Sequence, residues 1–194
     1  YRQLRMSARD LRPRFAQLAE LHFRHSPFGG DMGRIMAFGA AGFFPGLAPH
    51  HSLRISLAYQ ERVLPQRLSN TVQYQFPNLV SYPRGLETRY DERMQKLSLD
   101  YAFPLAYPEW SLPSVIYLKR LHANLFADYA RTRNMVSDTG KGIQTQTWYS
   151  SGLDLVAQMH LLRFFSPFDI GVRGIYQHQQ ANWSIRLLMV APLI

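Results

Sequence analysis

Hydrophobic and polar residues alternate along most of the chain with a period of two. Leu53, Ile55, Leu57 and Tyr59 share one face of such a segment, and Arg54 lies with serine and glutamine residues on the other. Successive side chains of a β-strand point to opposite faces, so this period predicts strands. Eight strands are predicted, over about 8–25, 33–44, 51–61, 94–107, 114–131, 144–163, 168–178 and 182–192.

The predicted strands are long enough to cross a lipid bilayer. Several exceed the roughly five to six residues that are usual in soluble sheets. A tilted membrane strand needs about 9–11 residues in the hydrocarbon layer. The segment 35–53 has no formal charge, but Pro45, Pro49 and three glycines interrupt it. A membrane-spanning helix is therefore not expected there, and any membrane crossing is expected to use strands.

The two faces of the predicted strands differ in a way that favours a membrane barrel. One face carries mainly leucine and aromatic residues, and the other carries Asp100, Asp128, His122 and Arg173. Such polar groups would destabilise the core of a soluble sandwich, but they suit a water-filled lumen. The pattern predicts an all-β fold, an antiparallel transmembrane β-barrel with lipid outside and water inside. A soluble β-sandwich binding module remains an alternative, because its strands alternate as well.

The connections between the predicted strands also alternate in length. Short, proline-containing turns at 44–50, 108–113 and 164–167 alternate with longer, more polar links, and only the link near 179–181 breaks the rule. Short turns on one side and long loops on the other are typical of outer-membrane barrels. Aromatic residues beside the short turns predict an interfacial girdle. They are Phe43, Phe44, Tyr107, Trp110, Phe164, Phe165 and Phe168.

Composition narrows the possible functions. Apolar residues make up 46% of the 194 residues and charged residues 18%, which argues against a disordered chain. The absence of cysteine excludes disulfides, thiolate metal sites and a cysteine nucleophile. The net charge of +9 raises the possibility of nucleic-acid binding. No nucleic-acid-binding motif is present, and arginines can line a lumen or meet lipopolysaccharide phosphate, so no nucleic-acid partner is expected.

The residues capable of chemistry form no catalytic or metal-binding pattern. His50 and His51 lie in a proline-containing turn without a carboxylate at metal-ligand spacing, and parity places His122 and His160 on the lumen face. The chain has no Gly-x-Ser-x-Gly motif. The glycines that flank Lys141 lack the strand–loop–helix setting of a phosphate-binding loop. We therefore expect no enzyme activity, no cofactor and no metal site.

Three motifs occur in order along the longest link and the two strands after it. They are Tyr-Pro-Arg-Gly-Leu at 82–86, Ser-Leu-Asp-Tyr-Ala-Phe-Pro at 98–104 and Phe-Ala-Asp-Tyr-Ala at 126–130. Together they resemble the C-terminal half of BamA/TamA-type outer-membrane assembly and translocation barrels, the bacterial surface antigen superfamily. That family has Val-Arg-Gly-Phe/Tyr in a long extracellular loop, then Ser-x-Glu-Tyr/Phe-x-x-Pro and Phe-x-Asp-x-Gly on the next two strands. Pro83, Asp100, Ala130 and the terminal Ile194 depart from the family pattern and indicate a divergent relative.

The resemblance implies a place for this chain within a larger barrel. In sixteen-stranded family members five strands follow the motif loop, and five predicted strands follow it here. Residues 1–194 would then form the C-terminal half of a sixteen-stranded barrel, with 62–93 as a long extracellular loop that folds toward the lumen. A half sheet has two open edges, which lipid does not tolerate, so an N-terminal half is expected to complete it. The chain starts at Tyr1, which suggests a removed targeting peptide or a fragment.

The resemblance also implies function, location and partners. The protein would lie in the bacterial outer membrane and help insert or translocate outer-membrane proteins without chemical catalysis. Its partners would be outer-membrane lipid and lipopolysaccharide, nascent outer-membrane proteins and accessory lipoproteins. A passive porin-like channel or a small self-contained eight-stranded barrel is the alternative; in the latter, side chains would fill the interior and the loop 62–93 would stay outside.

An ionic motif between loop and barrel wall is the candidate site. In the family the loop arginine contacts acids on the inner wall, which assigns this motif to Arg84, Gly85, Asp100 and Asp128. Parity places both aspartates on the lumen face, so we expect Arg84 within salt-bridge distance of one of them. The alternative is a solvated Arg84, with each aspartate paired to a strand neighbour.

Overall fold

The computed structural model describes residues 2–5, 10–26, 33–63, 76–112, 115–136, 142–161 and 168–190. All regular structure in these ranges is β, and no helix within them is long and apolar enough to span a membrane. The strands are β1 (Arg2–Arg5), β2 (Phe15–His25), β3 (Arg34–Pro45), β4 (Ser52–Val63), β5 (Arg93–Ala106), β6 (Trp110–Leu112), β7 (Ile116–Val136), β8 (Gly142–Leu161), β9 (Phe168–Gln177) and β10 (Asn182–Val190).

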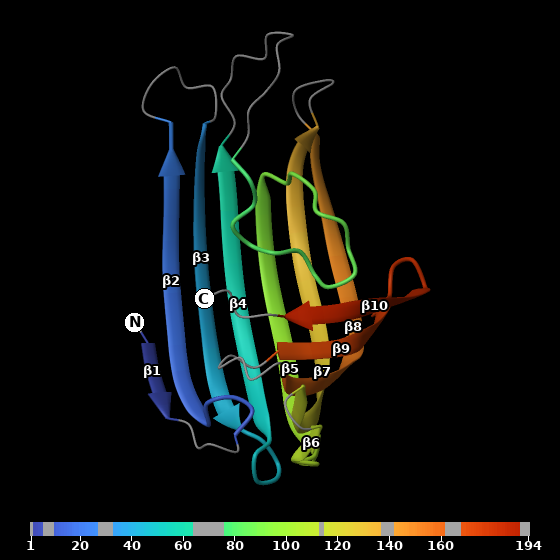
Figure 1. Ribbon diagram of the computed structural model, residues 1–194. Helices are drawn as coiled ribbons and strands as arrows, with labels where there is room; N and C mark the ends of the chain where they lie inside the picture. Colours follow the sequence, from blue (N-terminus) through green and yellow to red (C-terminus); the bar gives the residue numbers. More distant parts are fainter. Residues whose placement is uncertain are drawn as a thin grey trace.

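The strands form one antiparallel sheet in which neighbours in sequence are neighbours in space. The order is β1-β2-β3-β4-β5-β7-β8-β9-β10, and the short β6 pairs with β7 beside this path. The sheet is open, because β1 and β10 are its two edges and do not pair with each other. In Figure 1, β9 and β10 cross the direction of the other strands. Residues 76–92, which we call the docked link, pack on one face of this sheet. Arg186 of β10 reaches the link from that face and donates to the carbonyl of Gly85 at 3.0 Å.

The eight predicted strands correspond to β2, β3, β4, β5 and β7 to β10, and two parts of the prediction were wrong. The first predicted strand does not begin at residue 8. Residues 10–14 leave the sheet, because Pro13 has no N–H to donate and Arg120 of β7 donates to the carbonyl of Asp10 at 3.1 Å. A separate strand, β1, instead pairs with β2. The predicted turn at 108–113 contains β6, which pairs with β7.

The long link is slightly shorter than the predicted 62–93. The β3–β4 ladder continues to the pair of Arg34 and Val63, and the β4–β5 ladder to the pair of Glu61 and Arg93. The link therefore covers 64–92, of which 76–92 are described. Its described part, drawn in green in Figure 1, passes in front of the middle strands of the sheet.

Burial of the two sheet faces is the reverse of that in a water-soluble protein. The face toward the docked link, the inner face, buries polar side chains such as Gln60 (1% exposed) and Asp154 (4%). The opposite outer face exposes large apolar side chains such as Leu125 (48%) and Ile185 (80%). One sheet contains all described strands, so no second sheet covers the outer face in this part of the chain. The alternation therefore predicted the exposed and buried faces of middle strands such as β5, whereas β2 and β10 are largely exposed on both faces.

Exposed aromatic side chains occur where the short turns join the strands. Phe44 is the second-last residue of β3, Tyr107 follows β5 and Trp110 begins β6, and all three are exposed. These strand ends lie together at the lower end of Figure 1. Of the other predicted girdle residues, Phe164 and Phe165 lie outside the described residues. Phe43 is only half-buried and its ring lies 5.6 Å from Cζ of the inner-face Arg54, and Phe168 is also half-buried, so only part of the predicted girdle is exposed at this end of the sheet.

Candidate functional site at the inner face

Side chains of β4 hold the first part of the docked link. The buried Gln60 accepts hydrogen bonds at Oε1 from the N–H groups of Leu79 (2.7 Å) and Val80 (3.0 Å). Arg62 donates from Nη2 to the carbonyl of Phe76 at 2.9 Å. These bonds satisfy backbone groups that would otherwise lose their water when the link packs on the sheet. The link is therefore fixed to the inner face by specific polar contacts.

A second anchor joins the middle of the link to its end. The Tyr82 hydroxyl donates to one carboxylate oxygen of Asp91, and Asn134 of β7 donates from Nδ2 to the other. Burial raises the pKa of Asp91 above its ordinary value, against the opposing effects of Asn134 and the charge of Arg62. Lys96 of β5 donates to the carbonyl of Tyr82 at 3.1 Å. The link is thus tied to itself and to two further strands.

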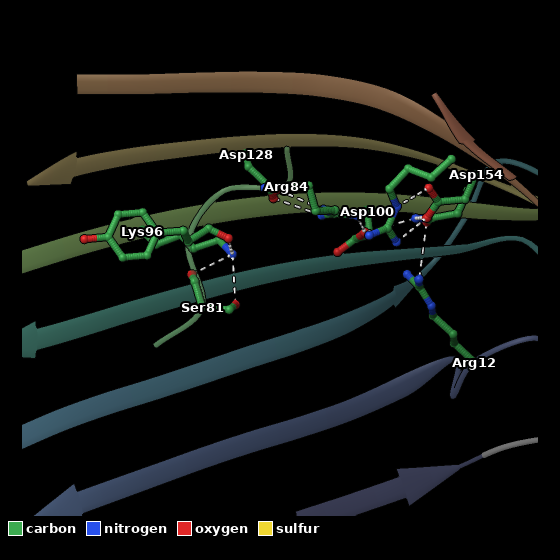
Figure 2. Close-up of polar contacts among 10 residues, drawn as sticks. Arg12, Ser81, Arg84, Lys96, Asp100, Asp128 and Asp154 are labelled. Atoms are coloured by element: carbon green, nitrogen blue, oxygen red, sulfur yellow. Dashed lines mark hydrogen bonds and ion pairs between the residues drawn. The ribbon is translucent and has the colours of Figure 1, made fainter. Parts of the chain in front are cut away.

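Arg84 lies at the centre of the docked link and binds two carboxylates at once. Its Nε and Nη2 donate to the two oxygens of Asp128 at 2.8 and 2.9 Å, and its Nη1 donates to Asp100 at 2.7 Å. Its backbone N–H also donates to Asp128 at 2.9 Å. Figure 2 shows the guanidinium between the two aspartates. The structure thus brings together the residues that sequence parity placed on one face.

The strands position the two aspartates through their register. Asp100 of β5 lies opposite Phe126 of β7, and Asp128 lies opposite Ser98, so the carboxylates are diagonal neighbours on the inner face. The Asp128 side chain is 0% exposed and that of Asp100 is 6% exposed. Two buried carboxylates at this spacing require a shared cation, which a planar guanidinium supplies in a fixed geometry.

The environment of Arg84 keeps its charge in place. Burial by itself would lower the pKa of Arg84, but the hydrogen bonds and charges of Asp128 and Asp100 outweigh it and raise the pKa above its ordinary value. The Cζ atom of Arg84 lies 3.9 Å from the centroid of the Phe126 ring. The positive charge also gains from this position over an aromatic face. Arg84 is therefore a permanent cation with a carboxylate on each side and a ring against its plane.

Gly85 turns the link and brings its backbone against β9 and β10. Its φ is 92°, and a Cβ at this position would lie 2.8 Å from Cγ2 of Ile175. The Gly85 carbonyl accepts hydrogen bonds from the side-chain amide of Gln177 and from Arg186. Both the backbone conformation and the close approach require glycine here. The fourth residue of the predicted motif thus connects the link to the last hairpin.

The ionic network extends beyond the residues that the sequence singled out. Asn124 of β7 donates from Nδ2 to Asp100 at 3.1 Å and to Asp154 of β8 at 3.2 Å. Arg173 of β9 binds both oxygens of Asp154, at 2.7 and 3.0 Å. Strand parity is the signal that places these three residues on the inner face. Arg12 donates to Asn124 at 3.3 Å. The alternating pattern placed Arg12 on the polar face of a predicted strand, but it lies outside the strands and reaches the network from the segment before β2.

The ionic network fixes the docked link to the sheet through arginine, aspartate and asparagine side chains that bind one another. Each of the three aspartates is bound by an arginine. The predicted turn histidines lie elsewhere: His50 contacts Asp10 at 2.9 Å, and His51 contacts the Tyr101 hydroxyl at 2.8 Å. Within the described ranges no three histidine, aspartate or glutamate residues group in a way that could hold a metal ion.

Gly152 of β8 leaves the space that Phe126 needs beneath Arg84. A Cβ at Gly152 would lie 2.1 Å from the carbonyl oxygen of Gly174 and 2.5 Å from Cζ of Phe126. We therefore expect Gly152→Ala to lower the free energy of unfolding by about 1–3 kcal/mol, because the ladder or the ring must move. Urea titration in detergent, followed by tryptophan fluorescence, measures this change.

A matched glycine provides the control. A Cβ at Gly174 meets nothing within 4 Å, so Gly174→Ala is expected to stay within about 0.5 kcal/mol of the parent protein. Equal effects of the two substitutions would show that general loss of strand flexibility, and not the space around Phe126, determines stability here.

Comparison of the chain with protein-family models, curated proteins and solved structures finds no match.

Proposed function

We propose that this sheet is part of an outer-membrane β-barrel whose protein helps to insert or translocate other outer-membrane proteins. The observation that carries the proposal is the docked link, whose Arg84 bridges Asp100 and Asp128 on a polar inner face. This geometry is the one that the resemblance to BamA/TamA-type barrels implies for its loop motif. The protein uses no cofactor and performs no chemical catalysis.

The outer face supports a location in lipid. Large apolar side chains are exposed along β7, β8 and β10, and they line a groove of about 810 Å³. In water such an apolar surface would promote aggregation, whereas in a bilayer it makes favourable contacts with the lipid hydrocarbon. The inner face holds the charges away from lipid, as in a barrel with a wet lumen. The localisation that follows is the bacterial outer membrane, with lipid and lipopolysaccharide as neighbours.

The two open edges support a larger barrel. Backbone groups of β1 and β10 that face outward along the edge have no partner strand in this sheet. In a membrane every such group must be paired, so further strands are needed to close the sheet. The main path of the sheet has nine strands with β1, so an N-terminal part that contributes seven more would give the sixteen-stranded barrel of the family. A self-contained eight-stranded barrel is disfavoured, because its narrow interior would have no room for the docked link.

The edge strand β10 suggests how insertion is assisted. It presents apolar side chains such as Trp183 (69% exposed) and Leu187 (70%) next to its free edge. An incoming strand of a nascent outer-membrane protein can pair with such an edge by β-augmentation. Accessory lipoproteins are further partners that the family resemblance implies.

A passive porin-like channel is the second candidate, and a cavity favours it. The inner face contains a polar cavity of about 560 Å³ beside the docked link. A lumen with such a space can admit water and small solutes.

Reconstitution of the whole protein into liposomes separates these candidates. An assembly factor is expected to accelerate the folding of an added, urea-unfolded outer-membrane barrel, measured by its gel mobility shift. Liposomes that contain an equal amount of an unrelated barrel are the control for bilayer defects. Ion conductance in planar bilayers without any acceleration would favour the channel, and extraction from membranes without detergent would contradict both.

A further inference from the structure

Two arginines beside the ionic network have buried N–H groups that bind nothing within the described residues. The Nε of Arg54 and the Nη1 of Arg12 are both buried without a hydrogen-bond partner. A buried guanidinium N–H without an acceptor is costly, since it has lost water and gained nothing in return. Both residues line the same inner-face cavity of about 560 Å³. Two donors from different segments thus lie at one space and lack an acceptor.

The charges around this cavity do not balance. Five cationic side chains line it, namely Arg12, Arg54, Arg84, Lys96 and Arg173. Two carboxylates of the ionic network, Asp100 and Asp154, lie among them, and Asp128 pairs with Arg84 without lining the cavity. Five cations therefore face three network carboxylates, an excess of two positive charges before Glu20 is counted. Glu20, at the edge of the cavity, is 58% exposed and pairs with His22 at 3.4 Å.

The ion pairs show which side chains carry the excess positive charge. Arg84 and Arg173 hold the three aspartates of the network. Arg12, Arg54 and Lys96 have no carboxylate within salt-bridge distance in the described part of the chain. Lys96 donates to neutral oxygens of Ser81 and Tyr82 (Figure 2), so its charge is also uncompensated.

We propose that this cavity binds a phosphate group, held by Arg54 and Arg12 with Lys96 adding charge. A phosphate monoester carries about two negative charges at neutral pH and a diphosphate carries more, which is enough to neutralise the excess. The phosphate oxygens accept hydrogen bonds from guanidinium groups in fork geometry. The volume is within the range of small-molecule sites. Binding would satisfy both orphaned N–H groups and neutralise like charges that now repel each other across the cavity. This site is separate from the bridge of Arg84 and from the proposed assembly function.

The test uses the whole protein in nanodiscs of phosphatidylcholine and titrates it with inorganic pyrophosphate by calorimetry. We expect saturable binding that Arg54→Gln weakens at least about tenfold, as loss of one or more charge-assisted hydrogen bonds implies. Arg133→Gln is the control, because this arginine of β7 is exposed and has the parity of the outer face, as Leu125 does. Its variant is expected to bind like the parent protein.

A second experiment distinguishes a lipid headgroup from a soluble ligand as the source of the phosphate group. Nanodiscs that contain phosphatidic acid compete with pyrophosphate if a lipid headgroup reaches the cavity, and they leave its binding unchanged if the natural ligand is soluble. If Arg54→Gln fails to fold, weakening of pyrophosphate binding is measured instead with Arg12→Gln, on a different segment, and with Arg54→Lys. Absence of saturable binding by the parent protein, or equal weakening by Arg133→Gln, would overturn the proposal.

Discussion

Replacing Arg84 by glutamine is expected to lower the free energy of unfolding by about 3–5 kcal/mol. The substitution removes the cation that Asp100 and Asp128 share, and their side chains are 6% and 0% exposed. Two buried carboxylates would remain side by side without compensation, so the docked link should detach and water should enter. Urea titration of the protein in detergent measures the change in stability, and hydrogen exchange of the Leu79 and Val80 amides measures release of the link.

A second arginine in the same link serves as the control for Arg84. Arg89 is exposed, and among the described residues its guanidinium contacts only the Trp148 ring, at 4.9 Å from the centroid. Arg89→Gln removes the same charge and is expected to cost about 0.5–1 kcal/mol. Combining Arg84→Gln with Asp128→Asn should cost less than the sum of the single changes, because the pair acts as a unit. Similar losses for Arg84→Gln and Arg89→Gln would contradict a bridging role.

Placing an arginine at Leu125 is expected to destabilise the protein in a bilayer by about 2–4 kcal/mol. Leu125 lies near the middle of β7 on the outer face and is 48% exposed. In lipid its position near the middle of the strand corresponds to the bilayer midplane, where a charge is most costly. In water, by contrast, replacing an exposed surface residue usually changes stability by less than about 0.5 kcal/mol. This substitution therefore tests which solvent covers the outer face.

The measurement compares folding of the variants in lipid vesicles by urea titration. Leu47→Arg is the matched control, because Leu47 is 96% exposed in the turn between β3 and β4, outside the strands. It is expected to remain within about 0.5 kcal/mol of the parent protein. A Leu125→Arg variant that folds as well as Leu47→Arg, and that stays soluble without detergent, would contradict the membrane proposal.

Alternation in the sequence predicted the eight main strands and the burial of each face. This worked because side-chain direction in a strand depends only on residue parity, which any long strand preserves. The same parity placed Asp100 and Asp128 on one face. It also made Asn124, Asp154 and Arg173 foreseeable as members of that face, although not as partners of one another.

Parity failed where the chain leaves the ladder. Residues 10–14 continue an alternating pattern, but contacts with β7 hold them off the sheet, and these contacts join positions more than a hundred residues apart. The short β6 forms because it can pair with β7, which local sequence does not reveal. Local patterns contain no information about such long-range competition for hydrogen bonds.

The sequence by itself determined the strands, the phase of their two faces and the residue types that meet across the link. Only the tertiary structure decided that one guanidinium reaches both carboxylates, that Phe126 and Gly152 make room for it, and that Arg12 and Arg54 converge on one cavity. The physical reason is that strand phase is a local property of the backbone. Side-chain convergence depends on register, curl and the path of the link, which are set by the packing of distant segments.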